Sequence, residues 1–317
     1  MTSRPKPGNL LNFHRPKRSA FSDETSEDTD ARQPFLKPES KQCIKNLASY
    51  SPARHWQELI VPKSRRAAVL VALFIGRKGD LYVLLSRRAS TLRTYAGDTS
   101  LPGGKWEPGD ANIEWTARRE AFEEIGLPLD RQRVPLLCVL EPFLAGNQLL
   151  VTPVVVLVLD KTITPILNSS EVASLFSHPL IGFLQSEPPF PLELETLEYK
   201  YHTHTDIDWG KYRFRMHRFL TGREAGGTKP VFGLTASILI RVASIGYGRK
   251  PDFEVNAPGQ PTHEERIVDA LKHHEVFRSA AIAERMDPDA LAAKACKLLP
   301  RKGVLGRKPR VVPKSRL

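Results

Sequence analysis

The stretch GGKWEPGDANIEWTARREAFEEIGL, residues 103–127, joins a glycine-rich turn to a segment that has neither glycine nor proline. That segment, Ala111 to Ile125, carries apolar residues that can cover one face of a helix. Gly126 is well placed to end the helix, and Pro128 cannot continue it. The pattern therefore predicts an α-helix over Ala111–Ile125, preceded by a flexible loop.

Three acidic residues of the predicted helix, Glu120, Glu123 and Glu124, are spaced i, i+3, i+4 and so share one face. Their mutual repulsion favours a hard divalent cation between them, because Mg²⁺ prefers carboxylate and water oxygens. A solvated acidic surface is the alternative, since charge runs often have no partner. The upstream turn favours the cation, because its glycines let the backbone approach a phosphate closely. Its residues are Pro102, Gly103, Gly104 and Gly109.

This stretch resembles the Nudix box of the Nudix hydrolases. The family pattern is Gly, five residues, Glu, seven residues, and then Arg-Glu-aliphatic-any-Glu-Glu-any-Gly-aliphatic. The matching positions are Gly104, Arg119, Glu120, Ala121, Glu123, Glu124, Gly126 and Leu127. Two departures stand out: Asp110 replaces the first Glu, and eight residues separate it from Arg119. The resemblance implies a Nudix fold of the α/β (α+β) class, with a mixed β-sheet sandwiched between α-helices.

The preceding residues, LLSRRASTLRTYAGDTSLPGG at 84–104, resemble the signature of one Nudix branch, the coenzyme A diphosphatases. That branch tolerates Asp and the longer spacing in the box. The matching residues are Arg87, Leu92, Arg93, Gly97, Pro102, Gly103 and Gly104, whereas Arg88 stands where Ser is common and Leu101 where Phe is common. The segment VFGLTA, 231–236, is similar to one near the end of the domain in that branch.

The resemblance implies metal-dependent hydrolysis of coenzyme A to 3′,5′-ADP and 4′-phosphopantetheine, or to the acyl form of the latter. Glu120, Glu123 and Glu124 are then expected to bind Mg²⁺ or Mn²⁺, and one of these acids could instead be the general base. Arg119 belongs to the catalytic box, where it is expected to pair with a carboxylate. Asp110 would support the loop or a second ion.

Several basic residues and the glycine-rich turn are expected to bind the phosphate groups of the substrate. The residues predicted to bind them are Arg87, Arg93, Gly103, Gly104 and Lys105. For Arg88, a pairing with nearby acids or with solvent is favoured.

Two other functions are considered. One is a Nudix pyrophosphatase acting on another compound, such as an oxidised nucleotide, NADH or a diphosphoinositol; the upstream signature argues against it. The other is a non-catalytic binding module with the same fold. Such a module should have lost acids of the box, whereas Glu120, Glu123 and Glu124 are all present.

Charge and composition exclude several classes of protein. The net charge is +12, but residues 1–45 account for +3 and residues 301–317 for +7, leaving +2 for the remainder. The basic character therefore belongs to the ends, and no nucleic-acid partner is expected. The apolar run 67–76 is too short to span a membrane. Cys43, Cys138 and Cys296 have no metal-ligand spacing, and Cys138 is expected to be a buried, inert thiol.

The chain is expected to divide into a disordered polar tail (1–45), a Nudix hydrolase domain (60–250), a helical extension (251–300) and a basic tail (301–317). Strands are predicted at 67–75, 81–86, 134–140 and 149–159, with a hairpin at 199–206 and 212–220. Helices are predicted at 43–59, with a break at Ser51-Pro52, and at 235–243, 263–277 and 287–299. Alternate residues His202, His204, Asp206 and Asp208 are interpreted as a polar hairpin face rather than a metal site.

The last three residues, Ser315, Arg316 and Leu317, form a conservative variant of the peroxisomal address Ser-Lys-Leu. They predict a peroxisomal import receptor as partner and a peroxisomal location. A mitochondrial location is the alternative, because residues 1–22 are basic and contain no acid, although three prolines oppose a transit helix. A cytoplasmic location is the other alternative.

Overall fold

The computed structural model describes residues 36–160, 162–189, 200–210, 212–224 and 227–299. The helices are α1 (Pro38–Ala48), α2 (Arg54–Gln57), α3 (Ile113–Ile125), α4 (Gly233–Tyr247), α5 (His263–His273), α6 (Glu275–Ala283) and α7 (Pro288–Ala295), with short 3₁₀ turns η2 (Lys63–Arg65), η3 (Leu180–Leu184) and η5 (Cys296–Leu298). The strands are β1 (Arg66–Ile75), β2 (Leu81–Arg88), β3 (Thr99–Ser100), β4 (Gly103–Lys105), β5 (Leu136–Val139), β6 (Phe143–Leu144), β7 (Leu150–Val158), β8 (Val172–Pro179), β9 (His202–Trp209), β10 (Tyr212–Glu224) and β11 (Gly227–Phe232).

The main sheet is mixed. Its order is β3-β2-β1-β7-β5, and β4, β6 and β8 pair with β1, β7 and β2 respectively. Strands β1 and β7 run parallel at its centre, with Arg66 opposite Leu150 and Phe74 opposite Val158, whereas the other pairs are antiparallel. Both strands are almost continuously apolar because both faces of the sheet are covered.

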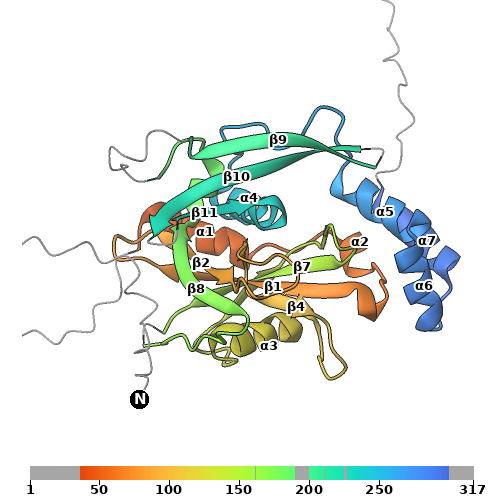
Figure 1. Cartoon of the computed structure of the whole chain (residues 1–317), viewed down its shortest axis with the longest axis horizontal. Helices are drawn as coiled ribbons and strands as arrows, with labels where there is room; N and C mark the ends of the chain where they lie inside the picture. Colours follow the sequence, from red (N-terminus) through yellow and green to blue (C-terminus); the bar gives the residue numbers. More distant parts are fainter. Residues whose placement is uncertain (1–35, 161, 190–199, 211, 225–226, 300–317) are drawn as a thin grey trace, which may run out of the picture.

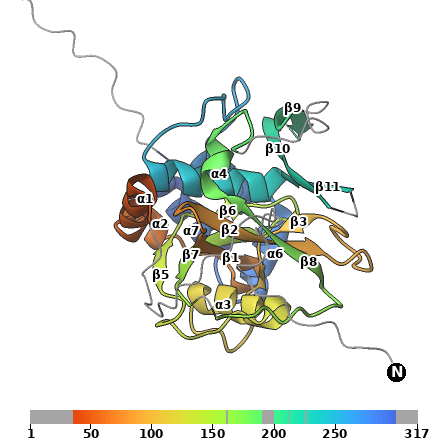
Figure 2. The same ribbon diagram turned by 90° about the vertical axis from the view of Figure 1, so that its left-hand side faces the viewer.

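Alternate side chains of the strands fill two cores, one on each face of the sheet. On one face, Leu70, Val154 and their neighbours pack under α3. On the other face, Val71, Val155 and their neighbours pack under α1 and α4. Figures 1 and 2 show the sheet between α3 and the pair α1 and α4. The predicted mixed sheet between helices is thus confirmed.

A second, three-stranded antiparallel sheet has the order β11-β10-β9 and lies over α4, on the far side from the main sheet (Figure 1). The predicted hairpin corresponds to β9 and β10, and its turn lies at Gly210 as expected. Strand β11 was not predicted. Its pairing with β10 begins at Glu224 opposite Gly227 and brings the chain to the first residue of α4.

Helices α5, α6 and α7 form a group beside the sheet (Figure 1). The predicted helix 263–277 is wrong in one respect: it ends at His273, and α6 begins at Glu275. His274 has an extended backbone, with φ −83° and ψ 121°, and its Nδ1 lies 2.6 Å from Oε1 of Gln148. A contact with a residue distant in sequence thus accompanies the break. The carboxylate of Glu284, directly after α6, accepts hydrogen bonds from the backbone N–H groups of Lys63 and Ser64, at 2.7 and 2.8 Å.

Helix α1 begins at Pro38, within the residues expected to form the polar tail. Cys43 and Leu47 are fully buried against α4, and Lys37 anchors the start through an ion pair of 2.8 Å to Asp80. Tertiary packing of these few apolar side chains therefore orders a segment whose composition alone indicated disorder. Cys138 is buried as expected, and burial raises the pKa of its thiol to about 12. No helix in the described ranges has the length and apolarity that crossing a membrane requires.

Candidate active site

The helix that carries the clustered acids forms as predicted, as α3. The side chain of Asn112 caps its start by accepting a hydrogen bond of 2.9 Å from the N–H of Trp115. Gly126 ends it in the left-handed conformation, with φ 69°. Ala117, Ala121 and Ile125 are buried against the sheet, which fixes the rotation of the helix. This rotation turns Glu120 and Glu124 toward β4.

Strand β4 places two glycines against this acidic face. A Cβ atom at Gly104 would lie 2.3 Å from Oε1 of Glu120, and one at Gly103 would lie 2.3 Å from the carbonyl oxygen of Ala68. Neither position has room for a side chain, because the first is occupied by a carboxylate and the second by the backbone of β1. Glycine at both positions lets β4 pair closely with β1 while the Glu120 side chain of α3 packs against it.

Glu120 and Glu124 are the two acids that face β4. Glu124 is buried, and its Oε2 accepts a hydrogen bond of 3.2 Å from the N–H of Gly103. Burial raises the pKa of Glu124 to about 8, and the neighbouring charge of Glu120 adds to this effect. Burial also raises the pKa of Glu120. Both shifts come mainly from burial, and a bound cation would oppose them by favouring the charged carboxylates.

A hard divalent cation fits these two residues. They offer carboxylate oxygens, the donor type that Mg²⁺ and Mn²⁺ accept, and the glycine backbone leaves the approach open. Within the described residues, no group of three or more His, Cys, Asp or Glu side chains stands ready to hold a metal ion. The structure thus brings together two of the three predicted ligands.

The third predicted ligand, Glu123, points elsewhere. Its side chain is 51% exposed and lies 3.2 Å from the guanidinium of Arg119. Arg119 also lies 3.1 Å from Oε1 of Glu120. Glu120 and Glu123 therefore both pair with Arg119. The hydrogen-bond partner of Glu124 is instead the backbone N–H of Gly103.

Arg119 and Asp110 hold the loop that precedes the helix. The guanidinium of Arg119 donates two hydrogen bonds to the buried Asp110 carboxylate, at 2.9 and 3.1 Å, and a third of 3.0 Å to the carbonyl of Lys105. The same carboxylate accepts hydrogen bonds from the N–H of Glu107 and the hydroxyl of Thr116. These bonds lower the pKa of Asp110 against the effect of its burial. Asp110, which departs from the family pattern, thus stabilises the loop between β4 and α3 through hydrogen bonds.

The predicted phosphate-binding side chains are spread over the site. Arg87 is on β2, opposite Thr99 of β3, and Thr235 of α4 donates a hydrogen bond of 3.4 Å to the carbonyl of Thr99. The upstream signature and the VFGLTA segment, which are far apart in sequence, therefore meet at Thr99. Arg93 and Lys105 are exposed, in the loop after β2 and at the end of β4.

Two further charged residues lie near Glu124. Glu171 precedes β8 and raises the pKa of Glu124, whereas Arg88 at the end of β2 lowers it. Asn168 connects these segments, since its N–H donates to the carbonyl of Glu124 at 3.0 Å and its amide donates to Glu171 at 3.3 Å. Sequence reasoning did not assign Glu171 a role, because its position beside the box depends on the pairing of β8 with β2.

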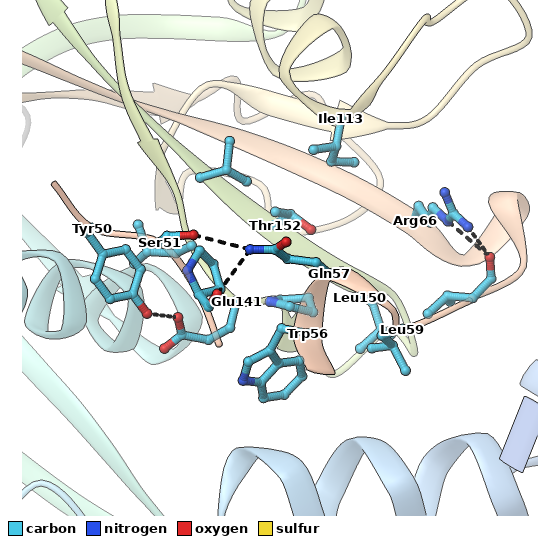
Figure 3. Close-up of a pocket in the computed structure, with 15 residues that line it drawn as sticks. Tyr50, Ser51, Trp56, Gln57, Leu59, Arg66, Ile113, Glu141, Leu150 and Thr152 are labelled. Atoms are coloured by element: carbon cyan, nitrogen blue, oxygen red, sulfur yellow. Dashed lines mark hydrogen bonds between the residues drawn. The ribbon is translucent and has the colours of Figure 1, made fainter. Parts of the chain in front are cut away.

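A pocket of about 430 Å³ opens near Ile113, the first residue of α3 (Figure 3). Trp56, Leu59, Ile113 and Leu150 line its apolar middle. Glu141 stands at one end, where it accepts hydrogen bonds from Tyr50 and Arg241 at 2.5 and 2.7 Å. This pocket contains none of the acids of the predicted site.

The four residues interpreted as a polar hairpin face are divided in the structure. Asp206 and Asp208 pair with Arg215 and Arg213 at 2.7 and 3.0 Å, as a polar face would. His202 is buried instead, and its ring contacts His217 through a hydrogen bond of 2.9 Å. The interpretation is therefore wrong for His202, because the segment around Phe253 covers that end of the strand.

The chain is similar to known proteins of one family. A family model described as "NUDIX domain" matches residues 64–215. The chain is 41% identical to "Nudix hydrolase 15, mitochondrial" and 38% identical to "Nudix hydrolase 22, chloroplastic", both of Arabidopsis thaliana; each match covers 64% of this chain, and 69% and 63% of the relative. It is 30% identical to "Peroxisomal coenzyme A diphosphatase 1, peroxisomal" of Saccharomyces cerevisiae, over 72% of this chain and 83% of that protein. The matches thus span about two thirds of the two plant proteins.

Proposed function

Because this chain belongs to the Nudix hydrolase family, we propose that it hydrolyses the diphosphate bond of coenzyme A and its derivatives. The products would be 3′,5′-ADP and 4′-phosphopantetheine, or its acylated form. The observation that carries the proposal is the placement of Glu120 and Glu124 against the glycines of β4. Coenzyme A is supported by the yeast relative's name and by the meeting of the upstream signature with the VFGLTA segment at Thr99.

Mg²⁺ or Mn²⁺ would be held by Glu120 and Glu124. Glu123, the third acid of the box, lies beside Arg119 and would join them only by turning inward. When bound, such an ion would offset the negative charge of the diphosphate and activate a water molecule. Nudix hydrolases generally use divalent metals, and a bound cation would oppose the raised pKa values of both glutamates by favouring their charged forms.

The chain's own residues would bind and orient the substrate. Gly103 and Gly104 let the diphosphate approach the backbone of β4 without a side chain in the way. The pairing of Arg119 with Asp110 keeps the loop from Lys105 to Asp110 in one position relative to α3. Arg87, Arg93 and Lys105 would contribute positive charge for the phosphates of the substrate.

The test is incubation of the full chain with coenzyme A and either Mg²⁺ or Mn²⁺, beside the variant Glu124→Gln. Chromatography should detect 3′,5′-ADP with the wild type and not with the variant. If a folded wild type leaves coenzyme A intact but cleaves NADH or an oxidised nucleotide, the substrate assignment is wrong and the hydrolase assignment stands. A folded protein that binds neither ion would indicate a binding module instead.

We also propose a peroxisomal location, delivered by an import receptor that binds Ser315, Arg316 and Leu317; these residues lie outside the described part of the chain. The relatives' names give mitochondrial, chloroplastic and peroxisomal locations. The proposal is tested by fusing a fluorescent protein to the N-terminus of the chain, with and without the last three residues. Peroxisomal fluorescence that survives their deletion, or a mitochondrial signal, would contradict it.

A further inference from the structure

The pocket at the start of α3 lies on the same face of the main sheet as the candidate active site. Ala68 and Leu70 of β1 belong to the core beneath α3, and alternation along the strand puts Arg66 on that face too. Ala68 lies opposite Gly104, where a Cβ atom would meet the carboxylate of Glu120. Arg66, which lines the pocket, is therefore about 7 Å along β1 from the level of Gly104.

Helix α3 gives a second measure of this separation. Ile113, its first residue, lines the pocket, and Glu120 follows seven residues later, which is about 10 Å along the helix axis. The pantetheine arm of coenzyme A has a backbone as long as that of about four amino-acid residues, so it reaches about 14 Å when extended. A diphosphate beside Glu120 therefore has the pocket within reach of its pantetheine arm.

The two ends of the pocket carry charges that the protein already pairs with its own groups (Figure 3). At one end, Glu141 accepts hydrogen bonds from Tyr50 and Arg241, which lower its pKa against the effect of its burial. At the other end, Arg66 donates from Nε and Nη2 to the carbonyl of Val61, at 3.0 and 2.6 Å. A phosphate group would meet an ionised carboxylate here, so the pocket suits an uncharged part of a ligand.

The middle of the pocket combines apolar surface with two polar groups that lack a partner. The indole of Trp56 and several aliphatic side chains supply the apolar surface. The amide nitrogen of Gln57 donates to the Ser51 hydroxyl and the Pro52 carbonyl, both at 3.2 Å. Among the described residues, neither Oε1 of Gln57 nor the hydroxyl of Thr152 has a hydrogen-bond partner. A ligand with amide groups between apolar segments would satisfy both, and pantetheine has two amides and a gem-dimethyl group.

We propose that this pocket binds the pantetheine arm of the substrate, with its amides at Gln57 and Thr152 and its apolar carbons against Trp56. The proposal rests on the proposed hydrolysis of coenzyme A. It places the uncharged half of the substrate in the pocket, away from the basic residues expected to bind the phosphates. Because the pocket holds none of the acids of the candidate site, its contacts should act on substrate binding, so changes in the pocket should raise KM and leave kcat nearly unchanged.

The experiment compares Trp56→Ala and Thr152→Val with Trp115→Ala, which removes a tryptophan that is 40% exposed and does not line the pocket. The dissociation constants of pantetheine and of 3′,5′-ADP are measured with the full chain, together with steady-state kinetics on coenzyme A. Trp56→Ala should weaken pantetheine binding and raise KM about 10-fold, because it removes apolar contact area. Thr152→Val, which changes the shape of the pocket little, should weaken pantetheine binding about 5-fold through one lost hydrogen bond. Trp115→Ala should match the wild type, and 3′,5′-ADP should bind all four proteins equally.

Binding of 3′,5′-ADP separates failure of this proposal from failure of the proposed function. If the wild type cleaves coenzyme A and binds 3′,5′-ADP, but pantetheine does not bind or binds both pocket variants as tightly as the wild type, the arm lies elsewhere and the proposal is overturned. A fall in kcat at unchanged KM would also overturn it. If the wild type binds neither compound and leaves coenzyme A intact, both assignments fail. Should Trp56→Ala fail to fold, Thr152→Val alone decides the question.

Discussion

Gly104 is the residue at which sequence and geometry constrain the site most tightly. A Cβ there would lie 2.3 Å from a carboxylate oxygen of Glu120, so Gly104→Ala should displace this side chain while leaving the sheet intact. A displacement of about 1 Å at a catalytic group costs on the order of 100-fold in rate. We therefore expect kcat of Gly104→Ala to fall about 100-fold, with the circular dichroism spectrum unchanged.

A double-mutant cycle separates this effect from general damage to the loop. In the background Glu120→Gln, which already removes the displaced charge, Gly104→Ala should lower activity only slightly further. If the two effects multiply instead, Gly104 acts independently of Glu120 and the steric explanation is wrong.

The three acids of the box should differ in their importance. Glu123 is half exposed and paired with Arg119, whereas Glu120 faces β4 and Glu124 is buried there. We expect Glu123→Gln to lower kcat/KM less than about 10-fold, and Glu120→Gln or Glu124→Gln to lower it more than about 100-fold. Calorimetric titration with Mn²⁺ should give the same order. Equal losses for all three would show that Glu123 turns inward when the cation binds.

The residues predicted from sequence are those whose positions follow from local geometry. Glu120 and Glu124 lie one turn apart on a helix, so their proximity could be predicted before any tertiary contact was known. The same reasoning placed Glu123 with them, but Glu123 also lies one turn from Arg119, which was expected to pair with a carboxylate, and the two form an ion pair in the structure. Glu171 comes near Glu124 because β8 pairs with β2, and a pairing between such distant segments leaves no local signal.

At the scale of elements, α3 was predictable because its cap, its apolar stripe and its terminating glycine all belong to one continuous stretch. The break between α5 and α6 was not, because His274 leaves the helix where it contacts Gln148 of the β6–β7 turn. Strand β11 was missed for a related reason: its residues become a strand only by pairing with β10.

The pair His202 and His217 connects β9, β10 and the segment that carries Val255. His217 donates from Nε2 to the carbonyl of Val255 at 2.8 Å, so its Nδ1 accepts the hydrogen bond from His202. Burial, followed by the charge of His217, lowers the pKa of His202 from 6.5 to about 4. The folded state therefore resists protonation of this ring more than the unfolded state does.

This shift has a defined consequence for stability. The contribution of His202 is complete above pH 6.5 and is lost as the pH falls toward 4, because the unfolded chain binds the proton more readily. The free energy of unfolding should be lower at pH 5 than at pH 7 by about 1–2 kcal/mol from this residue. Urea unfolding at the two pH values should show the difference, and His202→Phe should reduce it. An equal pH effect in the variant would rule out His202 as its source.

At the scale of the whole molecule, Glu284 fastens the group α5–α7 to the main domain. Its carboxylate accepts hydrogen bonds from the N–H groups of Lys63 and Ser64 and from the Ser64 hydroxyl, at 2.7 to 2.8 Å. Glu284→Ala should therefore speed amide hydrogen exchange in α6 about 10-fold, an effect of about 1 kcal/mol. Glu275→Ala, which removes an exposed acid of α6 that bonds only to Ser279 among the described residues, is the control.

Activity toward the substrate should be unaffected by Glu284→Ala, because neither Glu284 nor α6 contains a residue of the candidate site. A matching loss of activity would mean that the helical group supports the catalytic loop, and the expected independence would then be wrong.

The parallel pairing of β1 with β7 also bears on how the protein is made. These strands form the centre of the sheet, yet β2, β3, β4, α3, β5 and β6 all lie between them in the chain. Antiparallel neighbours can pair soon after they are synthesised, but a parallel partner must wait for the whole intervening segment. The acids of α3 therefore leave the ribosome before the strand that completes the core beneath them. During translation, α3 would have to wait for β7 before it could dock on a finished surface.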